Sequence, residues 1–235
     1  MALTTIGLMA LLGCFTGFMA GLLGIGGGMI ITPFLIMLIP SSLIPHEHIV
    51  HVAIATSLAT IAFTSLSSVR AHHKRGAVLW NVVASVAPGI LVGAVVGAQI
   101  AGWLPTFWLS LIFAAFVGFS AFKMFLNKSP RPDRNLPGTI GKFFMGIAIG
   151  ILSALVGAGG GFISVPWMIW CNVKMQNAVA TSAAFGFPIA LFGTIGYIIS
   201  GWNVSGLPPW PIDLGYICIP ALFSVAITSV LFAPL

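Results

Sequence analysis

Residues 24–33 read GIGGGMIITP, and residues 157–166 repeat the pattern as GAGGGFISVP. Both stretches lie inside otherwise apolar segments. Glycine gives the backbone extra freedom and proline lacks the N–H that a helix interior needs, so each stretch predicts a break in a helix. In lipid, the backbone groups freed by a break must be paired inside the protein or line a polar cavity. Breaks at corresponding places in two halves of a chain therefore point to a binding site between the halves.

The composition is that of a membrane protein. Hydrophobic residues make up 59% of the 235 residues and charged residues only 5%, and several apolar runs exceed the roughly 20 residues that cross a bilayer. The nine Lys and Arg, against three Asp and Glu, fall mostly in two stretches, at residues 70–75 and 127–139. Basic loops are typical of the cytoplasmic side. We therefore expect a lipid bilayer around the chain, both loops in the cytoplasm, and no nucleic-acid partner.

The apolar runs divide the chain into two repeats. We expect a first transmembrane repeat at residues 1–126, a basic, Pro-rich linker at residues 127–139 and a second transmembrane repeat at residues 140–235, which lacks a last span equivalent to residues 106–126. Where a loop of one repeat carries Lys or Arg, the equivalent loop of the other repeat carries none. Equivalent loops would therefore face opposite sides of the membrane, which favours an inverted repeat in which each glycine-broken segment forms a helical hairpin. The predicted fold is an all-α, polytopic integral membrane protein built from two homologous repeats.

The spans carry two further expectations. Residues 213–233 should form the last span, with Pro220 as the counterpart of Pro88 in the first repeat. Small residues let membrane helices approach closely, so the glycine face at Gly89, Gly93 and Gly97 leads us to expect a homodimer.

A second pair of matching motifs places hydroxyl groups inside apolar helices. Residues 53–57 read AIATS and residues 178–182 read AVATS. The hydroxyl side chains are those of Thr56, Ser57, Thr181 and Ser182. Such hydroxyls commonly bond the preceding helical turn or help helices pack. Because these hydroxyls recur together with the glycine stretches, we consider a role in substrate binding and a role in helix packing equally.

No group suited to covalent or acid–base catalysis is set inside the spans, so we do not expect an enzyme. The sequence has no Ser in a Gly-x-Ser-x-Gly elbow. Glu47 and Asp213 fall in loops or at span ends and Asp133 falls in the linker. We therefore expect no buried carboxylate of the kind that ion-driven carriers often use.

Metal and disulfide sites are also not expected. A metal carrier that uses His46, His48 and His51 is an alternative, since imidazole is a common ligand, but the second half has no matching cluster. The three cysteines are Cys14, Cys171 and Cys218; they are far apart and indicate neither a disulfide framework nor a metal site. We predict no metal and no cofactor.

The remaining features suit a small anion. The N-terminus of a helix carries a partial positive charge and unpaired N–H groups, and glycine lets a ligand approach them. Helices that restart after each glycine stretch would direct two such ends at one site. The predicted substrate-binding residues are Gly26, Gly27, Gly28, Thr56, Ser57, Gly159, Gly160, Gly161, Thr181 and Ser182. The candidate gate residues are His51, Gln176 and Asn81. Without a fixed Lys or Arg, such a site would bind an oxyanion and still release it.

These motifs, in this order, resemble the TauE/SafE sulfite exporter family. The likeness rests on GLLGIGGG at residues 21–28, HVAIATS at residues 51–57 and HHKRG at residues 72–76, with their second-half echoes, and it covers nearly the whole chain. The resemblance implies a multi-pass permease in the plasma membrane of a prokaryote that moves sulfur-containing anions such as sulfite or organosulfonates. The family also usually shows a further C-terminal span.

We therefore expect a transporter of small sulfur-containing anions, bound between the two repeats by helix N-termini and hydroxyls. One alternative is an anion channel, which predicts a continuous water-filled path. Another is a non-transporting membrane assembly or scaffold protein, which predicts tight packing at both glycine stretches and no polar cavity.

Overall fold

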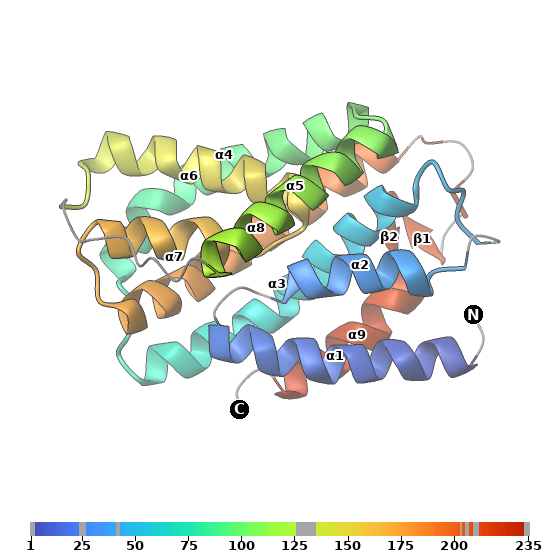
Figure 1. Cartoon of the computed structure of the whole chain (residues 1–235), viewed down its shortest axis with the longest axis horizontal. Helices are drawn as coiled ribbons and strands as arrows, with labels where there is room; N and C mark the ends of the chain where they lie inside the picture. The colour runs from blue at the N-terminus through green and yellow to red at the C-terminus, as the bar shows by residue number, and fades with distance from the viewer. Residues whose placement is uncertain are drawn as a thin grey trace.

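The structure is a computed structural model that describes residues 3–23, 27–40, 43–125, 135–202, 204, 207–208 and 212–232. This part of the chain is almost entirely helical (Figure 1). Its elements in chain order are α1 (Leu3–Leu23), α2 (Gly28–Leu38), α3 (Ile49–Lys74), α4 (Trp80–Trp103), α5 (Thr106–Phe125), α6 (Thr139–Val156), α7 (Gly161–Trp170), α8 (Met175–Gly201), β1 (Asp213–Leu214), β2 (Ile217–Cys218) and α9 (Ile219–Phe232). Gly26 and residues 127–134 of the predicted linker lie outside the described residues.

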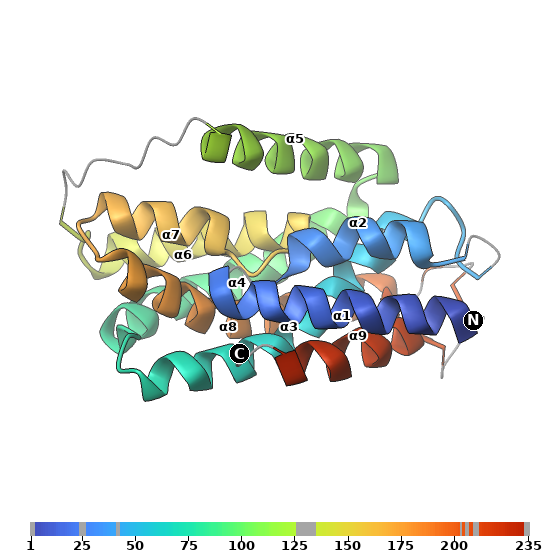
Figure 2. The ribbon, with the colours of Figure 1, turned by 60° about the horizontal axis from the view of Figure 1, so that its bottom comes forward.

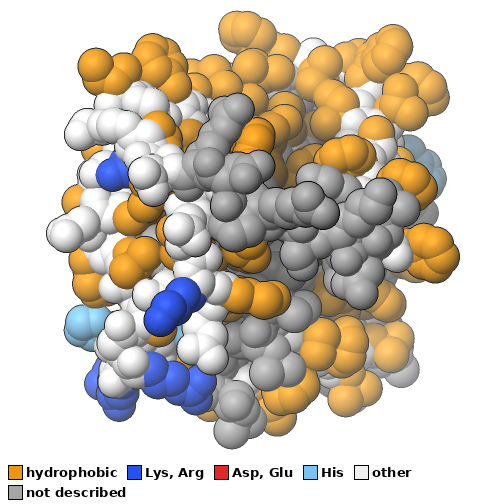
Figure 3. All heavy atoms as spheres, turned by 60° about the vertical axis from the view of Figure 1, so that its left-hand side comes forward, with side chains coloured by type: hydrophobic (Ala, Val, Ile, Leu, Met, Phe, Trp, Pro, Cys, Tyr) orange, Lys and Arg blue, Asp and Glu red, His pale blue; other side chains and the backbone are white. Residues whose placement is uncertain are grey.

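The outer surface and the charge distribution fit a membrane protein. Within the described residues, four helices are long and apolar enough to cross a bilayer: α3, α4, α6 and α8. Large hydrophobic side chains are exposed on several helices, including Phe107 and Trp108 of α5. Lys and Arg gather at one end of the molecule, where α3 ends and where α6 and α8 begin (Figures 1 and 3). The architecture is therefore that of a polytopic, all-helical membrane protein, as predicted.

The centre of the molecule is the crossing of α3 and α8. Every residue from 49 to 61 of α3 is buried, as expected for a helix whose apolar and small residues occupy all of its faces. The two helices pack on each other and run in opposite directions (Figure 1). The start of α3 therefore lies near the end of α8.

The other helices pack in two matching sets around this crossing. In one set α2 packs on α3 and α1 on α9, and in the other α7 packs on α8 and α6 on α4. Figures 1 and 2 show α2 running back toward the end where α1 begins, and α7 running back toward the end where α6 begins. α5 packs on α3 and α6 and lies along one side of the molecule (Figure 2).

Glycines allow the closest of these helix crossings. A Cβ added at Gly150 of α6 would lie 2.7 Å from the carbonyl oxygen of Ile90 in α4, and one added at Gly17 of α1 would lie 2.8 Å from the Cα atom of Ser229 in α9. A real Cβ does not approach other atoms this closely, so larger residues would separate each pair.

The glycine face of α4 does not serve the role that the sequence analysis assigned to it. Cβ atoms added at Gly89, Gly93 and Gly97 would meet the backbone of α6 in the same chain, and at Gly97 the carbonyl oxygen of Ile151 would be 2.7 Å away. This face is covered by α6 and is not free for a second copy. A homodimer therefore stays a prediction without this support.

The last helix, α9, begins at Ile219 and not at residue 213 as predicted. Asp213 pairs with Cys218 in a short antiparallel hairpin, and α9 begins directly after it. Pro220 is the second residue of α9, where the helix does not require a backbone N–H. Pro88 lies well inside α4. The predicted equivalence of the two prolines is therefore wrong.

Candidate functional site

The two glycine stretches meet at the middle of the molecule. A Cβ added at Gly28, the first residue of α2, would overlap the carbonyl oxygen of Gly157, which directly follows α6. Gly27 and Gly160 have φ of 70° and 79° and directly precede α2 and α7, in the left-handed region that favours glycine. Neither residue gives its helix a side-chain cap. We call this meeting point the glycine junction, made of residues 27–28 and 157–161.

Ser57 connects both halves of the glycine junction. Its hydroxyl oxygen lies 3.1 Å from the carbonyl oxygen of Gly157 and 3.3 Å from that of Gly28. A hydroxyl has one proton to donate, so the two carbonyl oxygens share the proton of Ser57, and this residue holds α3 against both glycine stretches. In the second repeat, Ser164 of α7 donates to the hydroxyl of Ser182 at 2.8 Å.

The two threonines of the Ala-Thr-Ser motifs make matching contacts with the starts of two helices. The hydroxyl oxygen of Thr56 accepts the backbone N–H of Cys218, just before α9, at 3.0 Å. The hydroxyl oxygen of Thr181 accepts the backbone N–H of Leu79, just before α4, also at 3.0 Å. Within the described residues neither hydroxyl donates a hydrogen bond. Each therefore keeps a proton that a ligand could accept.

We expect Thr56→Val and Thr181→Val each to lower the free energy of unfolding by about 1 kcal/mol, because each leaves one buried N–H at a helix start without its acceptor. The two threonines share no partner, so the losses should add in the double variant. Thermal unfolding in detergent measures both. A double variant no less stable than either single variant would show that these contacts do not hold α4 and α9.

Two further hydroxyls lie at the glycine junction and were not selected from the sequence. Thr32 Oγ1 would be 3.0 Å from a Cβ added at Gly157, and Ser153 Oγ would be 3.2 Å from a Cβ added at Gly160. Both oxygens are buried and have no hydrogen-bond partner among the described residues. The sequence signals that could have selected them are the position of Thr32 as the polar residue of its glycine stretch and the position of Ser153 one helical turn before the other stretch.

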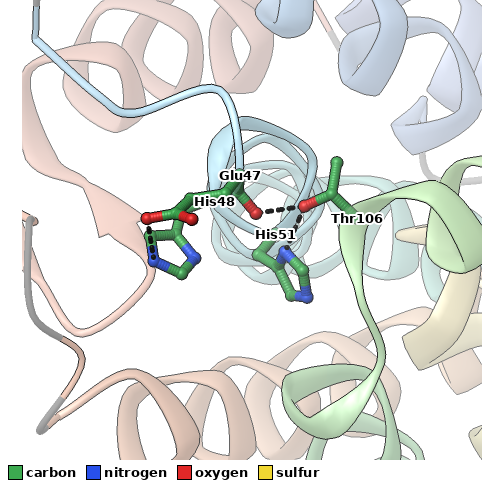
Figure 4. Close-up of polar contacts among 4 residues, drawn as sticks. All are labelled: Glu47, His48, His51 and Thr106. Atoms are coloured by element: carbon green, nitrogen blue, oxygen red, sulfur yellow. Dashed lines mark hydrogen bonds and ion pairs between the residues drawn. The ribbon is translucent and has the colours of Figure 1, made fainter.

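The candidate gate residues lie outside the glycine junction. His51 is in the first turn of α3, and its Nε2–H donates to the carbonyl oxygens of Ala101 and Leu104, each at 3.0 Å. Its Nδ1 lies 3.4 Å from the hydroxyl of Thr106, which donates to the carbonyl oxygen of Glu47 (Figure 4). His51 thus ties α3 to the end of α4. The remaining two, Gln176 and Asn81, are exposed second residues of α8 and α4.

The predicted absence of a buried carboxylate is wrong for Asp213. Its side chain is 4% exposed, and neither carboxylate oxygen has a hydrogen-bond partner of normal geometry among the described residues. Burial raises the pKa of the Asp213 carboxyl to about 6, and the thiol of Cys218 across the hairpin offsets only part of this rise. The sequence feature that could have indicated a buried carboxylate is that Asp213 is the single acidic residue of the second repeat and precedes the turn that leads into α9.

The histidines do not form a metal site with other ligands. His48 lies 3.6 Å from the carboxylate of Glu47, and its ring lies 6.2 Å from that of His51 at a steep angle. Within the described residues, no three His, Cys, Asp or Glu side chains gather as metal ligands.

Comparison with known proteins gives the family. The chain matches the model of the sulfite exporter TauE/SafE family over residues 9–235. It belongs to this family. A "Probable membrane transporter protein" of Haemophilus influenzae is 34% identical over 227 residues, which cover 96% of this chain and 85% of that protein. The "Probable membrane transporter protein YdhB" of Bacillus subtilis is 30% identical, with 79% and 76% covered. No solved structure matches the chain.

Membership in the TauE/SafE family identifies the chain as a multi-pass membrane transporter. A "Probable membrane transporter protein" of the archaeon Methanocaldococcus jannaschii, 28% identical over 94% of this chain and 80% of that protein, extends the likeness beyond bacteria. The family and the names of its members describe transporters and not enzymes.

Proposed function

We propose that this TauE/SafE protein carries small sulfur-containing oxyanions, such as sulfite or organosulfonates, across the plasma membrane of a prokaryote. The anion would bind between the two repeats at the glycine junction. The observation that carries this proposal is the pair of buried hydroxyls at that junction, Thr32 and Ser153, which have no hydrogen-bond partner within the described residues. The hydroxyls of Thr56 and Thr181, at the starts of α9 and α4, do not donate hydrogen bonds within the described residues either.

The chemistry of the junction suits an oxyanion. A buried hydroxyl without an acceptor is costly, and an anion oxygen supplies one. α2 and α7 begin there without side-chain caps, so their first N–H groups add donors and a partial positive charge. The described Lys and Arg lie near the ends of α3 and α5 and near the starts of α6 and α8, at one end of the molecule and away from this centre (Figure 1). A site of dipoles and neutral donors binds an anion weakly enough to release it.

The paired packing supports an inverted repeat. Exchange of α1 with α6, α2 with α7, α3 with α8 and α4 with α9 turns the pair α1–α9 into α4–α6, α2–α3 into α7–α8, and α3–α9 into α4–α8, and all of these pairs are packed. Each exchanged helix runs in the opposite direction (Figure 1). In this arrangement each glycine stretch would sit near the membrane midplane, with the basic end of the molecule in the cytoplasm. A carrier is favoured over a channel because residues 27–28 and 157–161 are buried.

Isosteric variants of the buried, unpaired hydroxyls test the proposal most directly. We expect Thr32→Val to leave thermal stability unchanged or to raise it, because it removes a polar group that has no partner. The same change, like Ser153→Ala, should reduce anion transport about tenfold or more, which corresponds to one lost hydrogen bond to a charged group. Uptake of labelled sulfite, thiosulfate, sulfate and sulfoacetate into proteoliposomes measures transport.

Thr64→Val is the matched control. Thr64 is buried in α3, and its hydroxyl bonds the carbonyl oxygen of Thr60 in its own helix at 3.3 Å, so its loss should not change transport. Normal rates in Thr32→Val and Ser153→Ala for every anion that wild type moves would contradict a site at the glycine junction. Anion currents that do not saturate would show a channel.

A further inference from the structure

Asp213 is a buried acid in the hairpin that directly precedes α9. It pairs with Cys218 across the hairpin, and the backbone N–H of Cys218 donates to the hydroxyl of Thr56 at 3.0 Å. Thr56 directly precedes Ser57, which bonds both glycine stretches. The hairpin packs on α3, α8 and α9. Asp213 is therefore connected to the glycine junction through Cys218 and two consecutive residues of α3, Thr56 and Ser57.

An ionised carboxylate is not stable in this place without a partner. Asp213 is 4% exposed, and no described residue forms a hydrogen bond of normal geometry with its oxygens. A buried charge must be paired or neutralised. No Lys or Arg is present on the described parts of the hairpin, α9 or the end of α8. Binding of a proton is the simplest neutralisation, and the raised pKa of about 6 lets that proton exchange in the physiological range.

Among the described residues, the titratable side chains at the hairpin come from the hairpin itself, from α8 and from the start of α3. Cys218 of β2 lies opposite Asp213. The rings of His48 and His51 at the start of α3 and of Tyr197 near the end of α8 lie 6.0, 5.1 and 6.3 Å from the ring of Tyr216 in the hairpin turn. The described residues of α9 carry no titratable side chain. Burial raises the pKa of the Cys218 thiol to about 12, so this neighbour does not compete for the proton near neutral pH.

We infer that Asp213 is the proton-binding group of this transporter, and that it takes up one proton when an anion binds beside Thr56 and releases it when the anion leaves. The inference rests on the proposed anion transport. An ionised Asp213 would repel the anion, whereas the neutral carboxylic acid would not, so each ligand favours binding of the other. Proton and anion would therefore cross in the same direction.

The test is proton movement in proteoliposomes that trap a pH-sensitive dye. In wild type, uptake of sulfate or thiosulfate, whose charges are constant between pH 5 and pH 8, should acidify the lumen. The half-saturating concentration of the anion should rise at least about fivefold from pH 5 to pH 8, the lower end of typical coupling between sites. Asp213→Asn, which is permanently neutral, should keep anion exchange but lose both the acidification and the pH dependence.

Glu47→Gln is the matched control, because Glu47 is an acid at the same end of the molecule whose side chain is 75% exposed. It should behave as wild type. Proton movement at wild-type stoichiometry in Asp213→Asn would overturn the inference, as would wild-type anion uptake that carries no proton or that requires Na⁺. In those cases anion transport itself still stands. If wild type moved no anion at all, the proposed function would fail instead.

Infrared titration gives a second reading that does not depend on transport. The chain has only three Asp and Glu side chains, so Glu47→Gln with Asp133→Asn leaves Asp213 as the sole acidic side chain. Its protonated C=O band should be present at pH 5, disappear as the pH rises through about 6, and be absent when Asp213→Asn is added. A band already lost at pH 5 would overturn the inference even if Asp213→Asn were unstable.

Discussion

Gly28→Ala is expected to abolish anion transport and to lower the free energy of unfolding by about 3 kcal/mol or more, the upper range for an overfilled core. The added Cβ would overlap the carbonyl oxygen of Gly157 and lie 2.5 Å from the Cδ1 atom of Ile61. The carbonyl belongs to the backbone and cannot rotate away, so the two glycine stretches must separate. Separation moves both helix starts that the proposed site uses. Thermal unfolding in detergent and uptake into proteoliposomes measure the two effects.

Gly118→Ala is the control for this expectation. Gly118 lies in α5, and a Cβ added there meets no atom within 4 Å. Alanine favours a helix over glycine by up to about 1 kcal/mol, so this variant should be as stable as wild type or more so, with normal transport. If Gly28→Ala were as stable and active as Gly118→Ala, the two stretches would not meet as the structure shows.

The sequence predicted the architecture because its strongest signals are local. Apolar runs give the spans, and glycine marks the places where α2 and α7 begin, at Gly28 and Gly161. The two prolines do not interrupt a helix, because Pro33 and Pro166 lie inside α2 and α7. The sequence also selected Thr56 and Thr181, and they occupy corresponding contacts at the starts of α9 and α4. A repeated motif is preserved in a fold when it makes the same contact twice.

The missed features depend on contacts between distant segments. Asp213 looked like a loop residue because it lies next to a turn, but it is buried in a hairpin that packs on α3, α8 and α9. The glycine face of α4 reads as a surface for a second chain, but α6, from the second repeat, covers it. The sequence shows that a helix has a small-residue face but does not say which helix packs there.

Ser57→Ala is the second variant for which we expect a large effect. The Ser57 hydroxyl is the donor shared by the carbonyl oxygens of Gly28 and Gly157. Removal of the hydroxyl leaves both buried carbonyl oxygens without this hydrogen-bond donor. We expect a loss of about 1–3 kcal/mol in the free energy of unfolding and a fall in transport. Ser85→Ala is the control, because the Ser85 hydroxyl bonds the carbonyl oxygen of Asn81 in its own helix at 2.8 Å.

The comparison of Ser57→Ala with Thr32→Val distinguishes two roles of the hydroxyls, helix packing and substrate binding. Ser57 donates inside the protein, so its loss should weaken the fold and transport together. Thr32 has no partner within the described residues, so its loss should weaken transport alone. If both variants instead lost stability and kept transport per folded molecule, the hydroxyls at the glycine junction would serve helix packing. The anion would then bind elsewhere between the repeats.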